Sequence, residues 1–158
     1  MHWSITPSTG QCIQRERWIG AVGRQTLFNG APAKARICPA LEGAQLATTS
    51  PHLFDAHQGE HYLALAAAVA GGNMRQGPIY GGDCYNYGLL ASGHIDLVVE
   101  TGLKLYDFAA LVPVVEGAGG RMCDWAGDPL HAGSSGEVIA AGDPARVEEI
   151  LEALACGH

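Results

Sequence analysis

An aspartate at the start of an apolar helix is the residue of this chain best placed for chemistry. Asp107 lies in the first turn of a helix expected over residues 106–116, where apolar residues recur at the spacing of a buried face: Phe108, Leu111, Val112 and Val115. The unpaired N–H groups of a helix N-terminus can orient its carboxylate toward a metal ion or a phosphate. The alternative is an ordinary N-cap. Pro113 lies inside this helix, and we expect a bend or an early break there.

A glycine-rich turn and a glutamate precede this aspartate. Gly81-Gly82-Asp83 lies where a short strand is expected to run into a helix over residues 83–91, and two positions without Cβ let backbone N–H groups approach a ligand closely. Glu100 lies near the end of an apolar strand, seven residues before Asp107. Asp83 could instead be the N-cap of its helix, a role that is compatible with ligand binding.

Taken together, these stretches resemble the C-terminal half of the inositol monophosphatase family of metal-dependent phosphomonoesterases. The family's second signature is similar to residues 106–110 and 116–120, with Tyr106 in place of Trp and Gly117 in place of Ala. These variants and Gly-Gly-Asp-Cys-Tyr at residues 81–85 resemble the histidinol-phosphate phosphatase branch. The resemblance also covers residues 17–20, 23–30 and 138–142.

The resemblance implies a site and a substrate class. Family members use two or three Mg²⁺ ions to polarise a phosphate and activate a water. By resemblance, Asp107 is a Mg²⁺ ligand, and the substrate pocket is shaped by Gly81, Gly82, Asp83 and Glu100. The implied substrate is a small phosphorylated metabolite, histidinol phosphate or an inositol phosphate. A carboxylate at position 83 suits a cationic amino alcohol phosphate.

The family's earlier metal-binding motifs have no counterpart in this chain. They are a Glu-Glu pair and Asp-Pro-Ile/Leu-Asp-Gly-Thr; Asp128-Pro129-Leu130 begins like the latter, but His131-Ala132 follows and the segment lies after Asp107. We therefore interpret the chain as a half-enzyme, truncated or partial, that is inactive alone and has an N-terminal half or a further copy of itself as partner. The alternatives are a partner-dependent half of a split phosphatase and a non-catalytic remnant with exposed apolar surface.

A candidate site of another enzyme class lies at residues 57–61. His57, Glu60 and His61 fit the H-x-x-E-H pattern of some zinc peptidases, with two histidines on one helical face and the glutamate as base. Gly59 disfavours that helix, so we expect a loop there that leads into an Ala-rich helix over residues 60–70. The histidines, with His52, are then solvent-exposed loop residues.

Length and element order indicate one α/β domain over residues 1–158. The chain is 47% hydrophobic, enough for one core without disulfides, and its strands alternate with helices. We expect residues 41–158 to form the C-terminal part of a layered α-β-α-β-α sugar-phosphatase-type fold. Residues 1–40 are expected to form an antiparallel hairpin segment, turning at Asn29-Gly30, that belongs to the sheet of the missing N-terminal half.

Charge and cysteine usage narrow the partners and the compartment. The net charge of −7, from nine basic and sixteen acidic residues, argues against nucleic acid as a partner. The longest apolar runs, 63–70 and 108–115, are far shorter than the roughly 20 residues that span a bilayer, so we expect no membrane partner. Five scattered cysteines without CxxC spacing, and no recognisable signal segment, predict reduced thiols in the cytoplasm.

Overall fold

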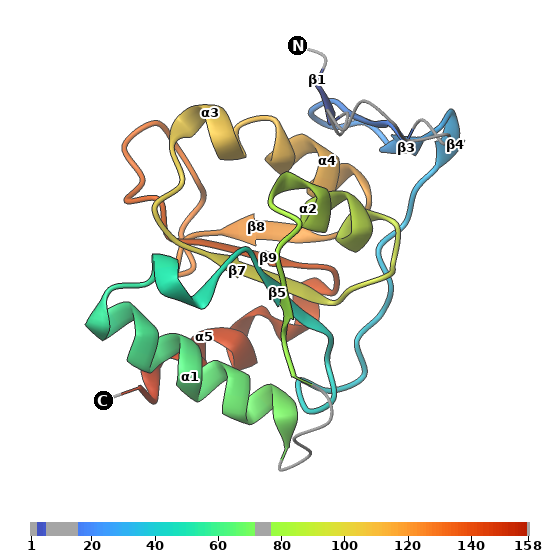
Figure 1. Cartoon of the computed structure of the whole chain (residues 1–158). Helices are drawn as coiled ribbons and strands as arrows, with labels where there is room; N and C mark the ends of the chain where they lie inside the picture. The colour runs from blue at the N-terminus through green and yellow to red at the C-terminus, as the bar shows by residue number, and fades with distance from the viewer. Residues whose placement is uncertain (1–2, 6–15, 72–76, 158) are drawn as a thin grey trace.

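A five-stranded mixed sheet, the central sheet, carries the structure (Figure 1). The computed structural model describes residues 3–5, 16–71 and 77–157. The strand order is β6-β5-β7-β9-β8; β5 is parallel to β6 and β7, and β9 is antiparallel to β7 and β8. The strands are β5 (Leu46–Thr48), β6 (Ile79–Tyr80), β7 (Leu97–Glu100), β8 (Arg121–Cys123) and β9 (Val138–Ala141).

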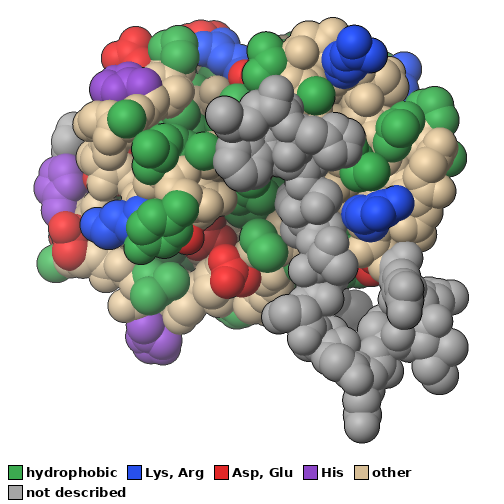
Figure 2. All heavy atoms as spheres, turned by 90° about the horizontal axis from the view of Figure 1, so that it is seen from above, with side chains coloured by type: hydrophobic (Ala, Val, Ile, Leu, Met, Phe, Trp, Pro, Cys, Tyr) green, Lys and Arg blue, Asp and Glu red, His purple; other side chains and the backbone are tan. Residues whose placement is uncertain are grey.

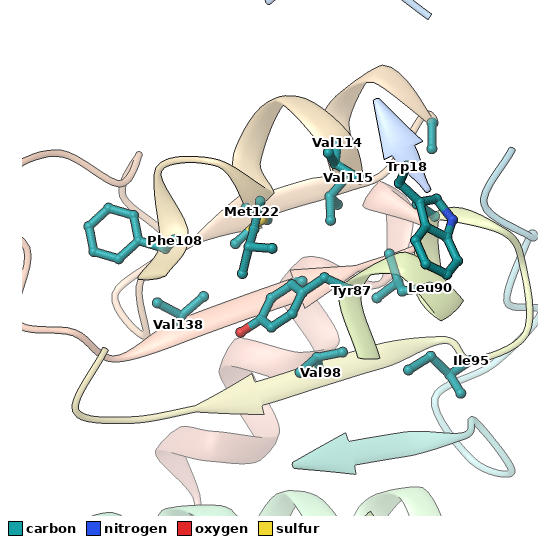
Figure 3. Close-up of a cluster of buried hydrophobic side chains, with 14 of the residues drawn as sticks. Trp18, Tyr87, Leu90, Ile95, Val98, Phe108, Val114, Val115, Met122 and Val138 are labelled. Carbon is teal, nitrogen blue, oxygen red and sulfur yellow. The ribbon is translucent and has the colours of Figure 1, made fainter. Parts of the chain in front are cut away.

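Helices cover both faces of the central sheet (Figure 1). One face packs on α1 (Ala56–Ala70) and α5 (Val147–Ala155), the other on α2 (Cys84–Ala91), α3 (Leu105–Phe108) and α4 (Leu111–Gly117). Every residue of β7 and β9 is buried, as a strand covered on both faces requires. Figure 3 shows the cluster on the second face, where sheet residues such as Val98 meet Tyr87 of α2 and Val114 of α4.

A second, antiparallel sheet, the N-terminal sheet, lies on the outer side of α2 and α4 (Figure 1). Trp18 attaches this sheet to α2. Its indole is 1% exposed and stacks on Phe28 with ring centroids 4.7 Å apart, and its Nε1 donates to Ser92 Oγ over 2.7 Å. Gly88 of α2 makes room, because a Cβ there would lie 2.9 Å from the indole. The strands are β1 (Trp3–Ile5), β2 (Trp18–Gly20), β3 (Leu27–Phe28) and β4 (Ala31–Pro32).

The expected fold class is confirmed. The described residues form helix, sheet, helix and sheet layers in that order, and the N-terminal segment is antiparallel. The Asn29-Gly30 turn between β3 and β4 has φ of 49° and 86°, the left-handed conformation that a tight hairpin demands. Residues 1–2 and 6–15 of the expected 1–40 segment lie outside the described residues. Within the described ranges, no helix is long and apolar enough to cross a bilayer.

The helix expected over residues 106–116 is broken, and the expected position of the break was wrong. It is two helices, α3 and α4, separated at Ala109-Ala110 instead of at Pro113. Pro113 is the third residue of α4, in the first turn, where an N–H has no intrahelical acceptor. A continuous helix would have set the proline ring against the Ala109 carbonyl, so the chain breaks one turn upstream.

The loop expected around residues 57–61 was also wrong, because α1 already begins at Ala56. Asp55 and Gln58 form a capping box, in which the Gln58 N–H donates to Asp55 Oδ1 over 2.8 Å and the Asp55 N–H donates to Gln58 Oε1 over 3.1 Å. Such a cap contributes about 1 kcal/mol, which offsets the cost of about 1 kcal/mol for Gly59 inside the helix.

Gly20 and Gly59 give opposite expectations for substitution by alanine. A Cβ on Gly20 would lie 2.6 Å from the Pro113 carbonyl oxygen, so Gly20→Ala should lower the free energy of unfolding by about 1–3 kcal/mol. Gly59 has open space, so Gly59→Ala should raise it by about 0.5–1 kcal/mol. Urea unfolding of both variants checks this. Equal effects would contradict the packing of the N-terminal sheet on α4.

Candidate active site

The carboxyl ends of β5, β6 and β7 meet at one edge of the central sheet. These three strands are parallel, so their ends point the same way. The Gly81 N–H donates to the Thr49 carbonyl over 2.9 Å, which ties the turn after β6 to the end of β5. Glu100 ends β7 beside them. The fold therefore brings the glycine-rich turn and Glu100 together, as the sequence predicted.

Glu100 is buried at this edge and held by hydroxyl and amide donors. It is 3% exposed; Oε1 accepts from the Thr49 N–H and the Thr49 hydroxyl, each over 2.8 Å, and Oε2 accepts from the Thr48 hydroxyl over 3.4 Å. Burial raises the pKa of Glu100; the Thr49 hydrogen bonds oppose that shift and the negative charge of Asp83 adds to it. The two threonines were missed from the sequence, although two hydroxyls ending an apolar strand were a visible signal.

The turn after β6 has an unusual backbone. Gly81, Gly82 and Asp83 all have positive φ, of 86°, 94° and 47°, and this is strained for the aspartate. Asp83 occupies the N-cap position of α2, as the alternative predicted, but its side chain makes no capping hydrogen bond. Buried Asn86, also missed from the sequence, holds the turn: its Nδ2 donates to the Gly81 carbonyl over 2.8 Å. The backbone of this turn thus sets the direction in which the exposed Asp83 side chain leaves the chain.

Asp107 is held by one carboxylate oxygen. It lies in the first turn of α3, as predicted, but as the third residue and not as the N-cap, which is Lys104. Asp107 Oδ2 accepts from the Lys104 N–H over 2.7 Å, while no hydrogen bond from a described residue reaches Oδ1. The side chain is half-buried. One oxygen is oriented and the other is available to a ligand.

The three carboxylates all influence one buried tyrosine electrostatically. Tyr87 of α2 is 2% exposed, and within the described part of the chain its hydroxyl has no hydrogen-bond partner. Burial raises the pKa of Tyr87, and the negative charges of Glu100, Asp83 and Asp107 raise it further, in that order. Figure 3 shows the hydroxyl pointing toward the Val138 and Phe108 end of the cluster. All three carboxylates are therefore near enough to act on the charge of the same buried side chain.

The residues at this edge fit only part of a Mg²⁺ site. Mg²⁺ requires near-octahedral oxygen ligands, and Asp107 Oδ1 suits one such position. Among residues 3–5, 16–71 and 77–157, no group of three or more His, Cys, Asp or Glu side chains is placed to hold a metal ion. The donor chemistry is suitable, but further ligands have to come from elsewhere.

The zinc-peptidase alternative lacks a third metal ligand among the described residues. His57 and His61 converge on one face of α1, with their Nε2 atoms 3.3 Å apart. Glu60 is exposed, and in the described ranges no third side chain completes a three-ligand group with the histidines. The pair therefore lacks the ligand set of a zinc hydrolase.

Comparisons with known proteins give a consistent family. The sequence model of the inositol monophosphatase family matches residues 7–157. The bifunctional phosphatase IMPL2, chloroplastic, of Arabidopsis thaliana is 48% identical over 151 residues, 91% of this chain and 42% of that protein. A histidinol-phosphatase of Chlorobaculum parvum is 28% identical over 156 residues, 96% of this chain and 54% of that protein.

The structural comparison agrees. An inositol monophosphatase from Zymomonas mobilis superposes with a TM-score of 0.84 and 52% identity, over 90% of this chain and 54% of that one. An inositol monophosphatase from Anabaena, at 22% identity, shares the fold with a TM-score of 0.75. The chain spans about half the length of the relatives it matches.

The raised pKa of Glu100 predicts a pH-dependent stability difference between the wild type and Glu100→Gln. A carboxyl with a raised folded-state pKa costs nothing below its unfolded-state value, 4.5, and destabilises as pH rises through the folded-state value. The variant should therefore gain stability relative to the wild type from about pH 4.5 upward, until the difference levels off.

Urea unfolding at several pH values measures this difference. Thr49→Val is the matched variant, because it removes a hydroxyl donor that lowers the pKa of Glu100 and should widen the pH-dependent gap. A gap that does not change with pH would mean that Glu100 is not desolvated on folding.

Proposed function

The chain belongs to the inositol monophosphatase family, and we propose that it carries half of a Mg²⁺-dependent phosphomonoesterase site. The observation that supports this most is that Thr49 contacts both the glycine-rich turn and Glu100 at the carboxyl end of the central sheet, while Asp83, Glu100 and Asp107 all act electrostatically on Tyr87. Phosphatase chemistry follows from the family, which is generally metal-dependent. The metal, the substrate and the residue roles are the proposal.

Asp107 is the proposed metal ligand. The Lys104 N–H holds Oδ2, so Oδ1 is presented without a large loss of side-chain freedom on binding. When bound, Mg²⁺ polarises the phosphate and lowers the pKa of a coordinated water. The role of Asp107 is to supply one oxygen at a fixed place beside the substrate pocket.

The proposed substrate pocket is the turn of Gly81, Gly82 and Asp83 together with Glu100. Two glycines let the substrate approach the backbone, and the exposed Asp83 carboxylate offers an ion pair to a cationic group. Glu100, fixed by Thr49, accepts a hydrogen bond from a polar group of the substrate. Two carboxylates favour a substrate with an ammonium group, so histidinol phosphate is preferred over an inositol phosphate.

We further propose that the rest of the site comes from a polypeptide equivalent to the unmatched half of the relatives. Residues 41–158 are then the C-terminal α/β part of one domain over 1–158, and residues 1–40 join a sheet that continues into that half. Val22 and Ile37 are 89% and 78% exposed, and Figure 2 shows several hydrophobic side chains on the face that carries the N-terminal sheet. A further copy of the chain is the other candidate partner.

A cytoplasmic location is also a proposal. The four cysteines within the described residues are free thiols, which fits a reducing compartment. They are Cys38, Cys84, Cys123 and Cys156.

The first expectation is that the isolated chain does not hydrolyse histidinol phosphate or inositol phosphate with Mg²⁺. Two cations cannot be held by one carboxylate ligand. Phosphate release measured on the purified chain tests this. Mg²⁺-dependent turnover lost in Asp107→Asn would contradict it and would mean that other carboxylates of the chain complete a site.

The decisive experiment supplies the missing half. The chain is co-expressed with the part of the Zymomonas mobilis enzyme that it does not match, and Mg²⁺-dependent hydrolysis should appear. Asp107→Asn should then cost more than the roughly 100-fold typical of outer-shell changes. Asp83→Asn should lose about 10- to 100-fold with histidinol phosphate and much less with inositol phosphate.

Asp128→Asn is the control, because Asp128 lies in a turn where its backbone pairs with Asp124. It should keep the restored activity. A stable complex without activity would overturn the proposal and favour the non-catalytic remnant.

A further inference from the structure

Two histidines of α1 form a pair that the proposed phosphatase site does not use. His57 and His61 lie one helical turn apart on the same face, with their ring centroids 4.4 Å apart and their planes at 64°. His57 is exposed and His61 is half-buried. Their Nε2 atoms are 3.3 Å apart, so both rings present the same kind of nitrogen to one point.

The second observation is that a backbone carbonyl contacts the ring nitrogen of His61 that faces away from His57. This nitrogen, Nδ1, contacts the Leu154 carbonyl oxygen of α5, which lies beside α1 (Figure 1). A carbonyl can only accept, so Nδ1 carries the hydrogen and the neutral ring has its lone pair on Nε2. Metal-binding histidines typically donate their other N–H to a carbonyl or carboxylate in this way, which fixes both tautomer and ring direction.

The spacing of the two nitrogens fits a tetrahedral metal ion. Two Zn–N bonds of about 2.0–2.1 Å at a tetrahedral angle place their nitrogens about 3.3 Å apart. The observed separation is 3.3 Å. A direct N–H···N hydrogen bond between the rings is the competing explanation, and it would be longer than the usual 2.9–3.0 Å or so for such bonds.

We propose that His57 and His61 form a two-histidine binding site for Zn²⁺. Imidazole nitrogen is a ligand that Zn²⁺ prefers, whereas Mg²⁺ prefers oxygen, so this site and the Asp107 edge select different ions. Among the described residues no third His, Cys, Asp or Glu side chain joins the two histidines, whereas a structural zinc centre has four protein ligands.

A metal ion bound by both histidines would stabilise the turn of α1 between them. The metal bridges the turn that contains Gly59, where a helix loses about 1 kcal/mol relative to alanine. Through the Leu154 contact it also fastens α1 to α5. Binding to the folded chain alone raises stability by mass action.

Thermal unfolding and calorimetry of the whole chain, stripped of metal with chelator, test the proposal. One equivalent of Zn²⁺ should bind, and at a 100-fold excess over the dissociation constant it should raise Tm by about 5–10 °C, whereas Mg²⁺ at the same concentration should not. His57→Gln and His61→Gln should each weaken Zn²⁺ binding at least about 10-fold. His57→Gln, at an exposed position, should keep the metal-free Tm of the wild type.

Matched variants separate this site from other ligands. His94→Gln removes an exposed histidine after α2, and Cys156→Ser removes an exposed thiol; both should keep the Zn²⁺ affinity. Cu²⁺ bound to the wild type should show nitrogen couplings from two imidazoles in its electron paramagnetic resonance spectrum, and from one in His57→Gln. Unchanged binding in both α1 variants, loss in either control, or no binding at all overturns the proposal. None of these outcomes bears on the phosphatase site.

Discussion

The structure depends on β7, a strand buried on both faces. The carboxylate of Asp96 lies just before this strand, and that of Glu100 lies at its end. The charge of Asp96 is compensated by Arg36, whose Nε donates to the carboxylate over 2.6 Å; the Gln45 N–H also donates to it over 2.6 Å. Burial alone would raise the pKa of Asp96, but the Arg36 and Gln45 contacts outweigh it and lower that pKa. Glu100 has threonine donors but no ion pair with a described residue, and its pKa is raised. One acid therefore fastens the N-terminal segment, and the other remains available at the proposed pocket.

The location of the site follows from the same strand. Parallel pairing of β7 with β5 sets Glu100 beside Thr49, and the β5–β6 pair brings the glycine-rich turn to the same edge. Antiparallel pairing with β9 runs along all of β7, from Leu97 to Glu100, and Glu100 is its one residue with a charged side chain. The helix layer above then positions Tyr87 and Asp107 over that end.

Features that depend on local sequence were predictable, and those that depend on distant partners were not. The helical first turn around Asp107 and the turn after β6 were predicted, because apolar spacing and paired glycines act within a few residues. The Thr49 contact with Glu100 joins residues 51 positions apart; the two hydroxyls at the end of β5 were visible in the sequence, but nothing local identifies Glu100 as their partner. The start of α1 is different: Asp55 and Gln58 are a readable capping box, and Gly59 was given too much weight against it.

The carboxylates at the sheet edge carry more negative charge than the described part of the chain compensates. The two ion pairs in those residues, Arg36 with Asp96 and Arg146 with Glu149, lie outside this group. The negative charge of Asp83 adds to the raised pKa of Glu100, and all three acids raise the pKa of Tyr87, whose hydroxyl has no hydrogen-bond partner among the described residues. A fold accepts such a local cost where a cation is to be bound, because the same repulsion that weakens the free protein strengthens binding of positive charge. Under the proposed function, the metal ion and the ammonium group of the substrate are that charge, and the missing half completes the compensation.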